Sequence, residues 1–207
     1  MEPGERARAF KAEVQQKIQK LLEDFASGQL SQAQFDIIYE RYHSQLILAE
    51  YAVESGKDAA VDIARSGPST ISLKEAAKGK ATGIAIYHIS GQRMIETLGD
   101  FAIPEDILEP MLQDLMRQIS TGNSPQRYVE RIASRYWLLF TIGRHTISIT
   151  LFHNEPSPIQ LRETQRLHQD FEAANSILLA DPKVEANRLA FPFRVFIRQQ
   201  FGGPPQV

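Results

Sequence analysis

The clearest pattern in the chain is a period-two alternation of apolar residues around Gly143, within SRYWLLFTIGRHTISITLF at positions 134–152. Such alternation on both sides of a glycine-containing turn predicts a β-hairpin with one buried face. That face would carry Tyr136, Leu138, Phe140, Ile142, Ile147, Ile149 and Leu151. The opposite face mixes Trp137, Leu139 and Phe152 with serines and threonines. This half-polar face predicts a sheet covered by helices on one side and by water or a partner on the other.

Near the N-terminus the apolar spacing changes to three and four. Residues 5–27 and then residues up to about 54 each show the stripe of an amphipathic helix. Gly28 stands where a helix C-terminal glycine belongs, and Ser31 with Gln34 matches a capping box for the second helix. The short connection predicts an antiparallel helical hairpin.

The second of these helices has more apolar residues than one packing face needs. Ile37, Leu48 and Tyr51 lie away from its main stripe, with Ile47 beside them. One interpretation is that the helix packs between its hairpin mate and the rest of the protein. The other is a self-association surface, because an exposed apolar helix face commonly binds a second chain.

Glycine and proline punctuate the chain from residue 55 to 82, where a short helix at 57–65 and a turn at 66–70 are expected. We therefore place a helical hairpin region at 5–65, a linker at 66–81 and a second domain at 82–200.

The second domain is predicted to alternate hairpins and helices. A hairpin at 82–99 precedes a helix at 104–120 that contains Pro110, and Tyr128–Ser134 is interpreted as helical because a strand fits its alternation less well. After the central hairpin, a long helix starts at Pro158 and alternating residues at 189–197 predict a last strand at a sheet edge. The fold class is therefore α+β, with an N-terminal antiparallel helical hairpin and an antiparallel-sheet domain of order hairpin, helix, hairpin, helix, strand.

Two parts of the chain resemble known families. The stretch GQLSQAQFDIIYERY at 28–42, a glycine turn followed by a serine-led helix with an aromatic residue at the fourth position after the cap, resembles the SHOCT oligomerisation hairpin. The stretches GIAIYHISGQRMIETLG, ILEPMLQDLMRQI and RYWLLFTIGRHTISITLF together resemble the profilin-like folds, most closely the roadblock and longin group. The first resemblance implies oligomerisation or tethering. The second implies a dimeric scaffold or a regulator of a small GTPase, without catalytic residues.

The composition narrows the function classes. The chain has no cysteine, which excludes disulfides, thiol catalysis and cysteine-based zinc sites. A net charge of −2 predicts no general attraction to nucleic acid. The N-terminal stretch lacks the apolar run of a secretory signal, and no apolar run approaches the ~20 residues of a membrane span. We therefore expect a cytoplasmic protein that does not bind a membrane, and nucleic-acid binding through a local basic patch ranks third among the functions considered.

No recognisable catalytic set is present. The five histidines lack metal-site spacing, and phosphate-loop, GxSxG and GxGxxG motifs are absent. The carboxylates Glu105, Asp106 and Glu109 fit the start of a helix, where they complement its dipole. We therefore expect no enzyme activity, no catalytic residue, no cofactor and no metal.

One charge feature remains as a candidate binding surface. Between residues 117 and 145 there are five arginines and a single acid, Glu130. Arg127, Arg131 and Arg135 would line one face of a helix, with Arg144 at the hairpin tip. The face is either simply solvated or a site for an anionic partner such as an acidic protein surface, a phosphate-bearing ligand or nucleic acid.

These features together predict a non-enzymatic regulatory or scaffold protein. It would self-associate as a homo-oligomer and dock a protein partner, such as a small GTPase, through helix and sheet faces. The alternative is a small-ligand sensor domain of GAF or PAS type, which also builds hairpins and helices around one antiparallel sheet. A cavity between the sheet and the helix at 104–120 would favour the sensor, whereas a filled core with an exposed apolar face would favour the scaffold.

Overall fold

The computed structural model describes residues 5–56 and 59–193. They fall into two compact units, which divide between Lys78 and Gly79, except that residues 157–159 group with the first unit. The mixed helix and sheet content confirms the α+β class, with a helical hairpin first and an antiparallel sheet after it.

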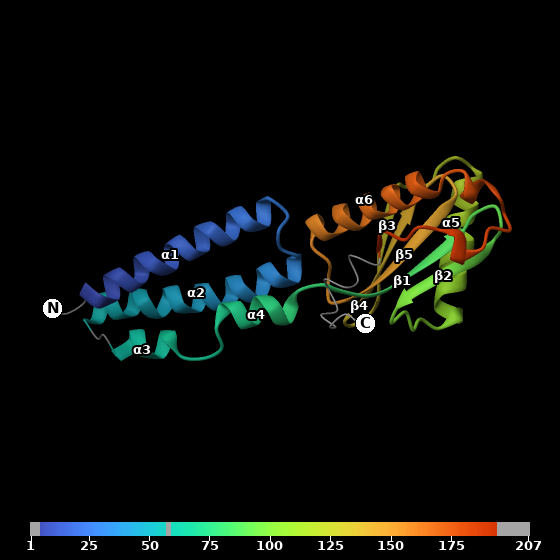
Figure 1. Cartoon of the computed structure of the whole chain (residues 1–207). Helices are drawn as coiled ribbons and strands as arrows, with labels where there is room; N and C mark the ends of the chain where they lie inside the picture. The colour runs from blue at the N-terminus through green and yellow to red at the C-terminus, as the bar shows by residue number, and fades with distance from the viewer. Residues whose placement is uncertain (1–4, 57–58, 194–207) are drawn as a thin grey trace, which may run out of the picture. The chain divides into compact units, whose positions relative to one another are not determined.

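The first unit contains four helices (Figure 1): α1 (Glu5–Ala26), α2 (Gln32–Ser55), α3 (Ala59–Arg65) and α4 (Thr70–Ala77). The predicted capping box is present at the start of α2. The Ser31 hydroxyl accepts from the Gln34 backbone, and the Gln34 side chain accepts from the Ser31 backbone. Gly28 adopts a φ of 77° in the turn before it, a conformation that glycine reaches without steric cost.

The predicted linker at 66–81 is wrong over residues 70–77, half of its length, because α4 forms there. The Gln34 side chain donates to the carbonyl of Lys74 at 3.0 Å, and the Tyr42 hydroxyl lies 3.3 Å from that of Thr70. These long-range contacts with α2 stabilise an eight-residue helix that would be marginal alone.

The second unit is built on a five-stranded antiparallel sheet of order β2-β1-β5-β4-β3. Its strands are β1 (Lys80–His88), β2 (Arg93–Gly99), β3 (Arg127–Ala133), β4 (Tyr136–Ile142) and β5 (Thr146–His153). The helices are α5 (Glu105–Ser120) and α6 (Pro158–Asn175), followed by short 3-10 turns at Leu178–Ala180 and Ala186–Arg188. Both predicted hairpins, β1–β2 and β4–β5, are therefore confirmed.

The predicted helix at Tyr128–Ser134 is wrong, because this segment is β3. It pairs with β4, so that Tyr128 lies opposite Phe140 and Val129 opposite Leu139. The spacing of apolar residues in this segment is compatible with a helix. However, the open edge of β4 has backbone N–H and C=O groups that need partners, and a strand pairs with them.

The last strand, expected at 189–197, is also corrected over its described part. Residues 189–193 form no strand. Instead the side-chain amide of Asn175 donates to the carbonyl of Ala190 and accepts from its N–H, both at 2.8 Å. This amide thus forms the hydrogen bonds that a neighbouring strand would otherwise form with Ala190. Next to it, Phe191 and Phe193 pack on Phe171 of α6. The remainder of the predicted strand lies outside the described residues.

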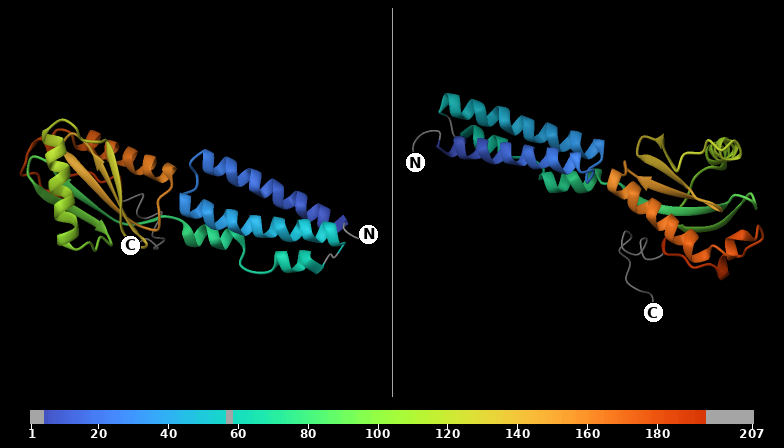
Figure 2. Two further views of the ribbon diagram at one scale, coloured as in Figure 1. Left: turned by 180° about the vertical axis from the view of Figure 1, so that it is seen from behind. Right: turned by 90° about the horizontal axis from the view of Figure 1, so that it is seen from above.

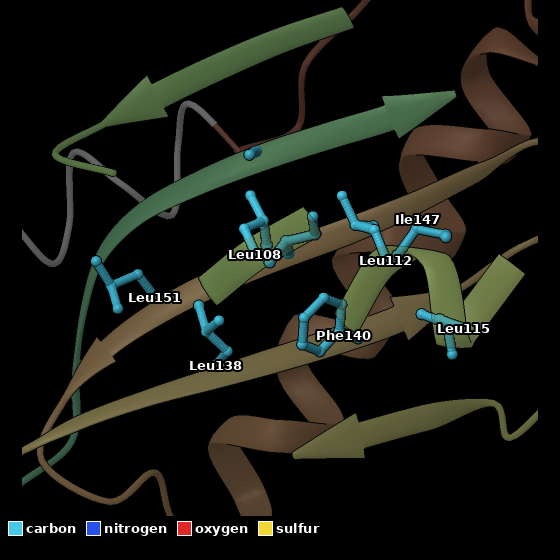
Figure 3. Packing of buried hydrophobic residues seen from close by; sticks show 9 residues of the cluster. Leu108, Leu112, Leu115, Leu138, Phe140, Ile147 and Leu151 are labelled. Carbon is cyan, nitrogen blue, oxygen red and sulfur yellow. The ribbon is translucent and has the colours of Figure 1, made fainter. Parts of the chain in front are cut away.

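One helix covers each face of the sheet, as the view from above shows (Figure 2). On one face Leu108, Leu112 and Leu115 of α5 pack on the alternating residues of β4 and β5 (Figure 3). On the other face Phe171 of α6 packs with Ile84 and Ile86 of β1. The expectation that the half-polar face meets water or a partner is therefore wrong.

Candidate partner-docking surfaces

The surplus apolar residues of α2 form an exposed stripe. Ile37 is 40% exposed, and Ile47 and Tyr51 are each 54% exposed. Leu48 is half-buried and packs against the core of the first unit, which includes Phe10 and Val14. Three large apolar side chains on one helix face thus remain in contact with solvent, whereas Leu48 belongs to the packed side of the helix.

The arginines do not form a helix face. Arg127 and Arg131 lie on the edge strand β3, Arg135 in the turn between β3 and β4, and Arg144 in the turn between β4 and β5. The guanidinium group of Arg131 lies 5.9 Å from the ring centre of Trp137 and donates to the carbonyl of Ser134 at 2.9 Å. Arg131 therefore stabilises the β3–β4 turn, and the prediction that Arg127, Arg131 and Arg135 line one face of a helix is wrong.

A groove runs along α5 beside strand β2. Its volume is about 630 Å³. The apolar lining comprises Tyr87, Met94, Leu108, Leu112 and Met116, and the polar lining includes Glu105, Glu109 and Gln113. None of the groove-lining residues is among the predicted partner-binding residues, and the signal that could have pointed to them is the clustering of three of the four methionines between positions 94 and 116. From the sequence alone, Glu105 and Glu109 are explained as partners of the helix dipole.

The rim of the groove carries net negative charge. Glu105 and Glu109 are exposed on α5, one helical turn apart. The only basic residue in the lining, Arg93, donates a hydrogen bond from its guanidinium group to the carbonyl of Val184. Arg93 keeps its positive charge, so the two carboxylates and this arginine leave a net charge of −1 in the lining.

A half-buried carboxylate holds the β4–β5 turn. The Glu172 side chain accepts from the backbone N–H groups of Arg144, His145 and Thr146, at 2.7, 2.8 and 2.8 Å. It also accepts from the Thr146 hydroxyl at 2.9 Å. The three consecutive N–H groups form a concave anion-binding turn, and a side chain of the protein itself occupies it.

His168 completes this network. Its Nε2 atom lies 2.8 Å from the Thr146 hydroxyl oxygen. The hydroxyl proton is already donated to Glu172, so Nε2 must carry a proton and donate to Thr146. Burial lowers the pKa of His168 to about 4, although the nearby Glu172 charge opposes that shift. The pKa of Glu172 is also lowered, because its backbone and hydroxyl hydrogen bonds outweigh its burial.

This network extends into a polar stripe on the buried side of α6. The buried side chains of the helix include Gln160, Thr164 and His168 besides Phe171. They face a sheet surface where Thr146, Ser148 and Thr150 are fully buried. His168 itself is only 2% exposed.

The described residues contain no arrangement suited to metal binding. In residues 5–56 and 59–193, no three histidine, aspartate or glutamate side chains come close enough to hold an ion. The other buried histidine, His88, is occupied structurally: Nδ1 accepts from the Gly91 N–H at 2.9 Å, and Nε2 lies 3.0 Å from the Leu179 carbonyl. Both ring nitrogens thus have backbone partners.

Comparison with known proteins gives no assignment. No protein-family model matches the chain, and no curated protein matches it significantly. Within the described part of the chain, no helix has the length and apolar character needed to cross a membrane. The function must therefore be argued from the surfaces themselves.

Proposed function

We propose that this chain is a non-enzymatic regulatory or scaffold protein that self-associates and docks a protein partner. The observation that carries the proposal is the exposed stripe of Ile37, Ile47 and Tyr51 on α2. Large apolar side chains concentrated on one helix face are typical of interaction surfaces. A second copy is the simplest occupant, because a two-fold interface brings the same patch of both chains together.

The partner-docking half of the proposal rests on the second unit. The groove beside α5 offers an apolar floor with polar groups at its rim, which is the composition of recognition grooves. Two groups of antiparallel strands on either side of α5 in the sequence support the profilin-like, roadblock-like resemblance, and through it a partner such as a small GTPase. A cytoplasmic location is part of the same proposal.

The test is the solution mass of the intact chain by light scattering over a range of concentrations, compared with the Ile37→Glu/Tyr51→Glu variant. We expect a dimer or larger species for the natural chain. The variant should shift to the monomer, because self-association would bury four carboxylates across a two-fold contact.

Ile177→Glu is the matched control, since Ile177 is 88% exposed and lies in the other unit. It should leave the mass unchanged. A monomeric natural chain, or equal masses for the natural chain and the Ile37→Glu/Tyr51→Glu variant, would refute self-association through α2.

A small-ligand sensor is the second candidate, favoured by the volume of the α5 groove. About 630 Å³ is within the range of small-molecule sites. However, the core between α5 and the sheet is filled by leucine, isoleucine and phenylalanine side chains (Figure 3), so the groove lies beside the helix and not beneath it. This open position fits a macromolecular segment better than an enclosed ligand.

A further inference from the structure

We propose that the α5–β2 groove binds a basic amphipathic helical segment of another protein. The inference rests on the proposed scaffold function and adds the chemistry of the partner. Its three supports are the methionine-containing floor, the acidic rim, and the partly closed edge of β2.

The floor of the groove suits an apolar helix face. Met94 comes from β2 and Met116 from α5, and they line the groove together with Leu108 and Leu112. Methionine is unbranched and polarizable, so it adapts to apolar side chains of different shapes. A helix that presents leucines or similar residues at spacings of three and four can fill such a groove.

The rim selects the charge of the partner. Glu105 and Glu109 stand on the same side of α5, and they outnumber Arg93, whose guanidinium group donates to the Val184 carbonyl. Helix α5 as a whole carries Glu105, Asp106, Glu109 and Asp114 against Arg117. Lysines or arginines flanking the apolar face of the partner would therefore be attracted, and acidic segments repelled.

The edge of β2 argues against a partner that adds a strand. The backbone N–H of Thr97 already donates to the carboxylate of Glu96 at 2.9 Å. An added strand would have to displace this carboxylate to reach the N–H. Side-chain contacts in the groove are therefore the favoured mode over backbone pairing along β2.

The test measures binding of a fluorescein-labelled synthetic helix to the intact chain by fluorescence anisotropy. The probe carries leucine at positions i, i+3, i+4 and i+7 and lysine elsewhere, and a second probe replaces every lysine with glutamate. We expect the lysine probe to bind and the glutamate probe not to bind. Equal binding of both probes would overturn the proposal.

The variant Glu105→Gln/Glu109→Gln should weaken binding of the lysine probe about tenfold, the order expected for two rim charges. The matched control is Asp106→Asn/Asp114→Asn, which removes the same charge from the same helix at positions outside the groove lining. An equal loss in the control would show a general charge effect and overturn the site. Met116→Gln should also weaken binding, while circular dichroism checks that the fold is retained.

Other occupants give distinguishable results. If the groove holds a second copy, Glu105→Gln/Glu109→Gln would change the solution mass and the lysine probe would not bind, which overturns the proposal. Failure at this groove leaves self-association through α2 intact, because that surface is tested separately by Ile37→Glu/Tyr51→Glu. Conversely, that α2 variant should still bind the lysine probe as the natural chain does.

Discussion

Glu172 shows how one side chain can organise a turn distant in the sequence. Its carboxylate lies among three backbone N–H groups and one hydroxyl, which together satisfy most of its hydrogen-bonding capacity. Hydrogen bonds to a charged acceptor contribute more than neutral ones, so this contact joins α6 firmly to the β4–β5 turn. The same carboxylate explains why the His168–Thr146 pair has a fixed proton arrangement.

His168 should make stability depend on pH. Burial lowers its folded-state pKa to about 4, whereas the unfolded chain titrates near 6.5. The unfolded state therefore binds more protons in this window, so stability is full above pH 6.5 and falls as the pH drops toward 4. We expect a loss of up to about 1.4 kcal/mol per pH unit, measured by urea denaturation between pH 7 and 4.5.

His168→Gln is the variant that checks this assignment. It should be less stable at pH 7 and much less dependent on pH across that window. The lowered pKa of Glu172 acts in the same direction, but it contributes only below its ordinary value of 4.5. An unchanged pH profile in His168→Gln would assign the effect to another group.

At the level of elements, the β4–β5 hairpin and α6 are coupled through Gly143. A Cβ at this position would lie 2.3 Å from the Glu172 carboxyl carbon, and the three nearest atoms all belong to that carboxyl group. A side chain here would therefore push the Glu172 carboxylate away from its N–H donors. This constraint comes from packing across the two elements, and not from the turn conformation itself.

A double-mutant cycle tests this coupling. Gly143→Ala and Glu172→Ala should each lower the free energy of unfolding by about 2–3 kcal/mol, since both remove the carboxylate from its N–H donors. The double variant should cost clearly less than the sum, because the added methyl group no longer meets a carboxylate. Glu163→Ala, an exposed change on the same helix, should alter stability by less than ~0.5 kcal/mol. Additive costs would contradict the coupling.

At the scale of the whole molecule, the two proposed surfaces differ in chemistry. The α2 stripe is apolar, with Ile37, Ile47 and Tyr51 exposed, whereas the α5–β2 groove has an acidic rim. A net charge of −2 for the whole chain gives no strong field that would impose one behaviour on both. Each surface should therefore respond to salt according to its own residues.

Because one surface is apolar and the other is charged, we expect salt to affect self-association and probe binding differently. Raising NaCl from 0.05 to 0.5 M should leave the mass from light scattering unchanged or slightly increased, because apolar contacts are not screened. The same change should weaken binding of the lysine probe several-fold, because exposed charges are screened beyond about a Debye length. If salt instead dissociated the oligomer, ion pairs and not the α2 stripe would hold it together.

The sequence by itself determined the elements whose signals are local. The α1–α2 hairpin, its capping box at Ser31 and the alternating strands β4 and β5 follow from spacing and from side-chain bonds to nearby backbone groups. These interactions span only a few residues, so they can be predicted without knowledge of the fold. The candidate stripe at Ile37 and Tyr51 belongs to the same class, because helix periodicity separates it from the packed face.

Only the tertiary structure decided the rest, because the deciding partners are distant in the chain. Residues 127–133 form a strand because they pair with the edge of β4. Residues 189–193 do not, because the side-chain amide of Asn175 forms both hydrogen bonds to the backbone of Ala190. His168 and Gln160 of α6 are buried because they have hydrogen-bonding partners distant in the chain, Thr146 and the Gly79 carbonyl. The groove likewise exists only where β2 and α5 meet, so its methionines and carboxylates carry no joint signal along the sequence.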